Sequence, residues 1–176
     1  PSQIVKDLAF GEAASNKIMS GVEKLTNAVK STLGASGKCV IFEDARGRPV
    51  ITKDGVTVAE SVVLIDPVEN IGATLIKEAA SNTVNEAGDG KTTATILAYS
   101  ILKNINETEH EETTRNLKDG ILSGADKVKV YLDKTSTPIK GKMLRNVASI
   151  SCNNDTQLGA KIGEAYEKVG SDGVVL

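Results

Sequence analysis

The chain of 176 residues is short of the side chains on which many catalytic and metal sites depend. It contains one histidine, His110, and two cysteines, Cys39 and Cys152. His110 lies in an acidic run and is expected to be solvated, and the cysteines are far apart in the sequence. A Ser-His-Asp triad, a Cys-His dyad and a zinc site are therefore disfavoured. Two distant cysteines also point to a reducing compartment.

Aromatic residues and excess charge are scarce as well. Aromatics make up 3% of the chain, with no tryptophan, so a core must be built from Val, Ile, Leu and Ala, which suits close helix packing. The formal net charge of −2 gives no electrostatic case for binding nucleic acid or an anionic membrane. No apolar run reaches the length of a membrane span, and no secretory signal opens the sequence. We therefore expect a cytoplasmic protein with no nucleic-acid or membrane partner.

What the chain does have is a strong helical pattern. Hydrophobic residues make up 40% of it and charged residues 25%, which suits a folded domain with a sizeable core. Apolar residues recur at spacings of three and four between glycine- and proline-containing turns, and this predicts helices. The predicted helices cover about residues 12–33, 67–87, 91–102, 117–132, 143–147 and 155–169. The helix from residue 91 is apolar on nearly all sides, so we expect it to be the buried central helix.

Short strands and one ambiguous segment complete the pattern. Residues 39–42 and 50–52 flank a polar turn and predict a β-hairpin, while residues 4–5 and 174–176 are further strand candidates. The segment 56–65 stays open, because its β-branched side chains favour a strand on propensity alone. The expected fold class is therefore mainly α, multihelical, with a small β-hairpin.

The start of the helix from residue 67 has a clear local signal. Asp66 is a candidate N-cap, Pro67 suits the first helical position, and Glu69 would complete a capping box. The glycine at position 88 marks the expected end of the same helix.

The most informative stretch is the glycine-rich turn at residues 88–95, Gly-Asp-Gly-Lys-Thr-Thr-Ala-Thr, which leads directly into an apolar helix. Glycines let backbone N–H groups approach an anion, and the helix start offers unpaired N–H groups and a positive dipole end. Asp89 supplies a carboxylate suited to Mg²⁺. The turn therefore indicates a site for a phosphate chain with its metal. The alternative is a solvated loop that only caps the helix.

The same turn is similar to the end of a P-loop, but two features disfavour that interpretation. The P-loop pattern requires a glycine at position 85, which is Asn85 here. A P-loop also follows a buried strand, whereas the residues before this turn have a helical periodicity.

Two other polar turns, Thr32-Leu33-Gly34-Ala35 and Lys53-Asp54-Gly55, also end a helix or a strand. Each has a simple structural explanation by itself. With the third turn, and in this order, they make the chain resemble the group I chaperonins, the ATP-driven ring-shaped folding machines. The segments that carry the resemblance are 32–34, 51–59, 69–73, 87–90 with 92–95, and 169–174.

The resemblance implies a domain organisation. Residues 1–134 would form the N-terminal half of the equatorial, ATP-binding domain, and residues 135–176 the first segment of an α+β intermediate domain. Residues 56–61 would be a short helix despite their strand-like composition. Only the first third of a chaperonin subunit is covered, so the apical domain and the C-terminal half of the equatorial domain would lie outside these residues.

The resemblance also implies the roles of individual residues. The expected ATP-binding residues are Thr32, Leu33, Gly34, Ala35, Lys53, Asp89, Gly90, Lys91, Thr92 and Thr93. Asp89 would ligate Mg²⁺, and a K⁺ ion would lie near Thr32, Lys53 and Thr92. Asp54 would be catalytic, near the γ-phosphate and the attacking water. Hydrolysis in the family also needs an aspartate from outside these residues, so this chain alone should bind ATP but scarcely cleave it.

The expected function is that of an ATP-dependent protein-folding chaperonin subunit. It would hydrolyse ATP to drive the conformational cycle of a homo-oligomeric ring, expected to be seven-membered, that acts on unfolded clients with or without a co-chaperonin. The alternatives are an ATP-binding ring scaffold and an ATP-using enzyme without chaperone activity. Asp54 and Asp89 argue against the scaffold, and the lack of a second set of acid–base groups argues against the enzyme.

Two positions depart from the family pattern. Ala35 stands where the family usually has proline, and Lys91 where it has threonine. A cation at the positive end of a helix is unfavourable unless an anion offsets it. Two orientations of Lys91 stay open, one toward a phosphate and one into solvent. The departures favour a divergent member of the family, and a viral one would act in the host cytoplasm.

Overall fold

The computed structural model describes residues 8–34, 36–108, 111–152, 154–170 and 173–174, and it divides into two compact units. The first unit spans residues 1–110 and the second residues 111–176. This division lies before the helix that the resemblance assigns to the equatorial domain, so the domain boundary near residue 134 stays a prediction. No helix of the described residues is long and apolar enough to cross a membrane.

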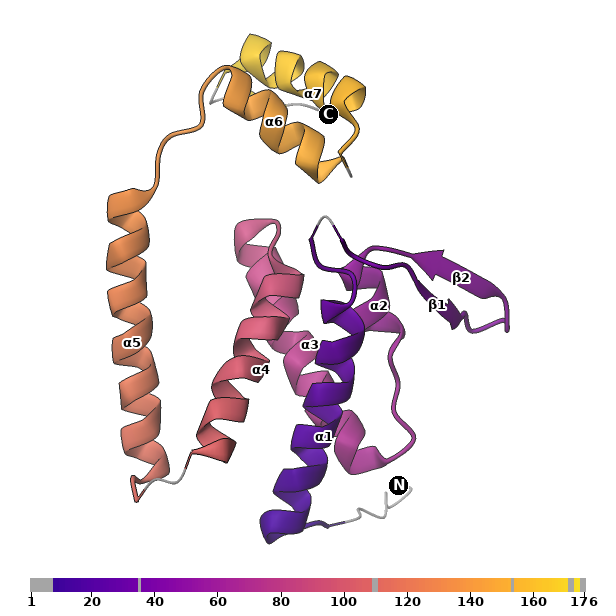
Figure 1. Ribbon diagram of the computed structural model, residues 1–176, viewed down its shortest axis with the longest axis vertical. Helices are drawn as coiled ribbons and strands as arrows, with labels where there is room; N and C mark the ends of the chain where they lie inside the picture. The colour runs from indigo at the N-terminus through magenta and orange to yellow at the C-terminus, as the bar shows by residue number, and fades with distance from the viewer. Residues whose placement is uncertain (1–7, 35, 109–110, 153, 171–172, 175–176) are drawn as a thin grey trace, which may run out of the picture. The chain divides into compact units, whose positions relative to one another are not determined.

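The first unit is a group of packed helices with one hairpin. Its elements are α1 (Gly11–Lys30), β1 (Val40–Glu43), β2 (Pro49–Thr52), α2 (Gly55–Ser61), α3 (Pro67–Ala87) and α4 (Lys91–Glu107). Helix α1 contacts α2, α3 and α4, and the helices lie side by side in Figure 1. The core residues are Val22, Leu25, Val29, Ala59, Ala73 and Ile76. The aliphatic core that the composition predicts is therefore confirmed.

Helices α1 and α3 approach each other at two glycines. A β-carbon on Gly21 would lie 1.8 Å from the carbonyl oxygen of Glu69. A β-carbon on Gly72 would lie 2.1 Å from the carbonyl oxygen of Ile18. Real atoms do not come this close, so the two backbones can be this near only because both positions lack a side chain.

Polar contacts flank this close approach. The Nζ atom of Lys17 lies 2.6 Å from Asp66 Oδ2, and that of Lys24 lies 2.6 Å from Glu69 Oε2. The hydroxyl of Ser20 also donates to Glu69, at 2.8 Å. These contacts tie the first turn of α3 to the middle of α1.

The capping box predicted at the start of α3 is only half correct. Asp66 is the N-cap and accepts hydrogen bonds from the backbone N–H groups of Val68 and Glu69. The carboxylate of Glu69 does not complete the box, because it accepts hydrogen bonds from Ser20 and Lys24 of α1 instead. A tertiary contact thus replaces the local one that the sequence suggests.

The hairpin and the short helix α2 follow the expectations. Strands β1 and β2 are antiparallel, with Ile41 opposite Ile51. The segment left open by propensity forms α2, as the resemblance implies. Val58 and Ala59 are buried, and this tertiary packing favours a helix there despite the β propensity of the individual residues. The strand candidate at 4–5, and most of that at 174–176, lie outside the described residues.

The expectation that α4 is the buried central helix is wrong for the described part of the chain. Only Lys91 and Thr95 are buried on α4. Leu97 is 58% exposed and Ile101 is 43% exposed. Within the first unit the helix packs against α1 and α3, and most of its residues are only partly buried or exposed.

The second unit contains α5 (Thr114–Thr135), α6 (Lys142–Ser151) and α7 (Thr156–Val169). Helices α6 and α7 pack against each other where Gly159 faces the backbone of Ser149. An ion pair of 2.8 Å joins Arg145 to Glu167 beside that contact. Helix α5 has no buried residue.

Replacing Gly72 with alanine should destabilise the first unit. The added methyl group cannot fit against the Ile18 carbonyl, and overpacking of this kind costs about 1–3 kcal/mol, more than the roughly 1 kcal/mol that alanine gains in helix propensity. We expect a lower midpoint in thermal unfolding followed by circular dichroism. Gly124→Ala is the control, because a β-carbon there would meet no atom within 4 Å. Equal stability of Gly72→Ala and the unmodified chain would contradict the close helix contact.

Candidate functional site

The first part of the site is the turn that ends α1. The helix ends at Lys30, before the expected Leu33, because the backbone tightens here into bonds from Thr32 N–H to Val29 and from Leu33 N–H to Lys30. The Thr32 hydroxyl donates to the Val29 carbonyl at 2.7 Å. Gly34 follows with a φ of 78°, which favours glycine. Ala35, the next residue of the expected site, lies outside the described residues.

The second part is the start of α2, where Asp54 is the N-cap. Its carboxylate accepts hydrogen bonds from Val56 N–H at 3.1 Å, from Thr57 N–H at 2.9 Å and from the Thr57 hydroxyl at 2.6 Å. Partial burial raises the pKa of Asp54, but these hydrogen bonds and the charge of Lys91 outweigh it. The pKa therefore lies below its ordinary value of 3.8, and Asp54 is ionised at neutral pH.

The third part is the turn between α3 and α4. Gly88 ends α3 with a φ of 77°, and Gly90 is the N-cap of α4 with a φ of 95°. Between them, Asp89 is exposed and its Oδ1 accepts the Gly90 N–H at 2.6 Å. The first N–H groups of α4 have no acceptor within the helix and carry its positive dipole end. Such a helix start is suited to an anion.

The three turns meet at Gly55. A β-carbon on this residue would lie 2.5 Å from the Thr92 hydroxyl oxygen and 2.9 Å from the Thr32 hydroxyl oxygen. The end of α1 and the starts of α2 and α4 therefore surround one small volume that only a glycine leaves open. The three separate sequence signals describe one place in the fold.

Lys91 takes neither of the two orientations that the sequence leaves open. Its Nζ lies 3.0 Å from Oε1 of Glu60 on α2, and its side chain is only 10% exposed. The solvated orientation is therefore wrong, and Glu60 is the anion that offsets the lysine at the helix start. Glu60 gives no signal in the sequence, because it lies 31 positions from Lys91 and no local pattern links the two residues.

Asp89 has its hydrogen bond within its own turn, and three further residues of the expected site also lie outside the contacts that join the turns. Leu33 is 49% exposed. Lys53 is exposed and, within the described part of the chain, makes no hydrogen bond or ion pair. Thr93 is exposed on the first turn of α4. All three lie within or directly beside the turns that converge.

The described residues hold no group of three or more His, Cys, Asp or Glu side chains that could bind a metal by themselves. Asp89 is therefore a single protein carboxylate at this turn. A hard cation bound there would need further oxygen ligands, such as those of a phosphate chain.

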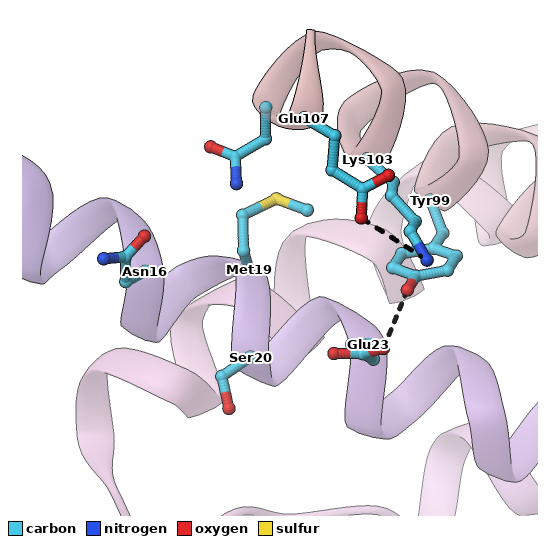
Figure 2. Close-up of a pocket in the computed structure, with 8 residues that line it drawn as sticks. Asn16, Met19, Ser20, Glu23, Tyr99, Lys103 and Glu107 are labelled. Atoms are coloured by element: carbon cyan, nitrogen blue, oxygen red, sulfur yellow. Dashed lines mark hydrogen bonds and ion pairs between the residues drawn. The ribbon is translucent and has the colours of Figure 1, made fainter.

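A separate polar pocket of about 260 Å³ lies between α1 and α4 and contains none of the expected site residues (Figure 2). The Tyr99 hydroxyl donates to Glu23 at 2.9 Å, and Lys103 pairs with Glu107 at 3.6 Å. The Lys103 Nζ also lies 5.9 Å from the centre of the Tyr99 ring. These groups satisfy one another, so the pocket does not replace the site at the helix starts.

The architecture is that of a mainly helical domain in which three polar turns at helix ends converge on one glycine. The TCP-1/cpn60 chaperonin family model matches residues 25–173. The chain belongs to this chaperonin family, which confirms the resemblance seen in the sequence.

Two kinds of solved chaperonin share this fold. Chaperonin gp146 from bacteriophage EL 2 (Pseudomonas aeruginosa), crystallised in the presence of ATP-BeFx, is 27% identical with a TM-score of 0.80 over 94% of this chain. A group III chaperonin in the open state is 23% identical with a TM-score of 0.74 over 89% of this chain, a likeness of fold alone. This chain spans 30% of the length of the former and 32% of the latter.

Asp54→Ala should lower the free energy of unfolding by about 1 kcal/mol, because the start of α2 loses its cap. Asp54→Asn should lower the free energy of unfolding much less, since asparagine caps about equally well.

The same residue predicts a pH dependence of stability. Because the pKa of Asp54 is lowered in the folded state, the contribution of the ionised form is present above about pH 3.8 and is lost as the pH falls through the folded-state value. Urea unfolding of all three proteins between pH 2 and pH 7 measures both effects. Equal stability of the alanine and asparagine variants would contradict the capping role.

Proposed function

We propose that this chain is part of an ATP-dependent protein-folding chaperonin subunit, and that the site around Gly55 binds ATP. The observation that carries the proposal is the convergence of the three polar turns at that glycine. The crystallisation of the phage chaperonin in the presence of ATP-BeFx supports it. The cycle of ATP hydrolysis and ring movement is part of the proposal.

The residues of the site are suited to binding a nucleoside triphosphate. In this proposal the N–H groups at the start of α4, from Gly90 to Thr93, bind the phosphates. Thr32, Leu33, Gly34 and Ala35 line the nucleotide. Since the Lys91 ammonium is paired with Glu60, Lys91 contributes its backbone N–H. Lys53, exposed and without a partner among the described residues, is available for a phosphate.

The metal ions belong to the proposal as well. Asp89 would hold Mg²⁺, and a bound Mg²⁺ neutralises charge on the phosphates. Thr32, Lys53 and Thr92 would lie near a K⁺ ion. The ionised Asp54 would orient the attacking water. Such a role is expected because enzymes catalyse phosphoryl transfer mainly by positioning the reactants and by electrostatic stabilisation. Because hydrolysis in the family needs a further aspartate, this chain alone should bind ATP more readily than it cleaves it.

The partners are those of a chaperonin ring. We propose a homo-oligomeric ring, expected to be seven-membered, with unfolded proteins as clients and with or without a co-chaperonin. A cytoplasmic location, or the host cytoplasm for a viral member, completes the proposal. The alternatives are a ring scaffold that binds ATP and an ATP-using enzyme without chaperone activity.

Refolding of a denatured test protein separates these functions. A chaperonin should raise the yield of active test protein when ATP is added, with hydrolysis that depends on the ring. A scaffold should bind ATP without turnover. An enzyme should consume ATP only with its own substrate and leave the yield unchanged.

Asp89→Ala in the full-length subunit should reduce Mg²⁺-dependent ATP hydrolysis to the background level, because the turn loses its one carboxylate. The exposed position of Asp89 predicts little change in thermal stability. Phosphate release measured over a range of Mg²⁺ concentrations checks the first expectation. Glu86→Ala, an exposed carboxylate at the end of α3, is the matched control and should keep normal turnover. Near-normal hydrolysis by Asp89→Ala would refute the assignment of Asp89 to the metal.

A further inference from the structure

Helix α2 is held to α4 at both of its ends. At its start, Gly55 is buried beside the Thr92 hydroxyl. Near its end, the Glu60 carboxylate lies 3.0 Å from the Lys91 ammonium. The two partners on α4 are consecutive residues at the start of that helix. The first turn of α4 therefore contacts α2 near both of its ends.

The environment of this ion pair makes it more than a surface contact. The side chain of Lys91 is 10% exposed, whereas that of Glu60 is 67% exposed. Removing the carboxylate would leave a largely buried ammonium without its partner, which proteins tolerate poorly. The ammonium would then have to move, or α2 would have to shift so that water can reach it.

A shift of α2 matters because of what the helix carries. Its seven residues are too few to form a stable helix alone, so contacts with neighbouring elements set its position. Asp54 is the N-cap of α2, and its carboxylate therefore moves with the helix. The Glu60–Lys91 ion pair is therefore one of the contacts that set the position of the Asp54 carboxylate.

We propose that Glu60 is a positioning residue of the ATPase site. Through its ion pair with Lys91, it fixes α2 against the start of α4 and thereby fixes Asp54 beside the phosphate-binding turn. The same contact keeps the Lys91 ammonium from serving as a phosphate ligand. This inference rests on the proposed ATPase function and adds a residue outside the three turns.

The test uses the full-length subunit with Glu60→Gln, Lys91→Met and the double variant. Glu78→Gln, an exposed carboxylate on α3 with no side-chain hydrogen bond or ion pair among the described residues, is the control. Three quantities are measured, namely kcat and KM for ATP, equilibrium binding of a fluorescent ATP analogue, and the thermal midpoint without nucleotide.

Each single variant should lower kcat by about 10-fold, because a small misplacement of a catalytic group is costly. The KM and the affinity for the analogue should stay within about two-fold, because no phosphate ligand is lost. The double variant should be no worse than the poorer single variant, since both single variants remove the same ion pair. The control should match the unmodified protein. If Glu60→Gln fails to fold, Glu60→Asp takes its place, with a smaller loss of kcat expected.

Two results would overturn the inference. A rise in KM for Lys91→Met together with a fall in KM for Glu60→Gln would show that Lys91 is a phosphate ligand competed for by Glu60. A lower thermal midpoint with unchanged kcat would show a purely structural bridge. Failure of the proposed function is recognised separately, because the unmodified subunit would then neither bind the analogue nor hydrolyse ATP.

Discussion

The close contact between α1 and α3 is the constraint on which the candidate site depends. Gly21 and Gly72 let the two backbones approach to a distance that no side chain allows, and the Lys24–Glu69 pair fixes the register beside them. Helix α1 then delivers Thr32 at its end, and α3 delivers the turn that starts α4. A site assembled from helix ends can be no more precise than the packing of the helices that carry it.

The sequence predicted best what is decided locally. Asp66, Asp155 and Gly88 mark helix boundaries because a capping side chain or a left-handed glycine acts within a few residues. Contacts between residues that are distant in the sequence could not be predicted from it. The carboxylate of Glu69 pairs with α1 in place of completing a capping box. The prediction that α4 is buried was wrong. Apolar residues indicate that a helix can be buried, but they do not indicate which element packs against it.

In the candidate site, too, local features could be predicted from the sequence and long-range contacts could not. The three turns were found from glycine, threonine and aspartate patterns, and the order of the turns led to the family. Their convergence at Gly55 is a property of the tertiary structure. Glu60 gave no signal, because an exposed glutamate on a short helix is unremarkable until Lys91 is placed beside it. Because Lys91 is paired with Glu60, the proposed phosphate site relies on the backbone N–H groups and the dipole of α4 rather than on the Lys91 ammonium.

Helix α5 contrasts with these packed elements. It runs for 22 residues, and none of its side chains is buried by the described part of the chain. A helix of this kind gains and loses turns from its ends as temperature changes, without the sharp transition of a packed core. We expect the amide hydrogens of the described α5 to exchange through local fraying rather than through cooperative unfolding of a packed core. Within the second unit, α5 therefore has the thermodynamics of a peptide helix, in contrast to the packed pair of α6 and α7.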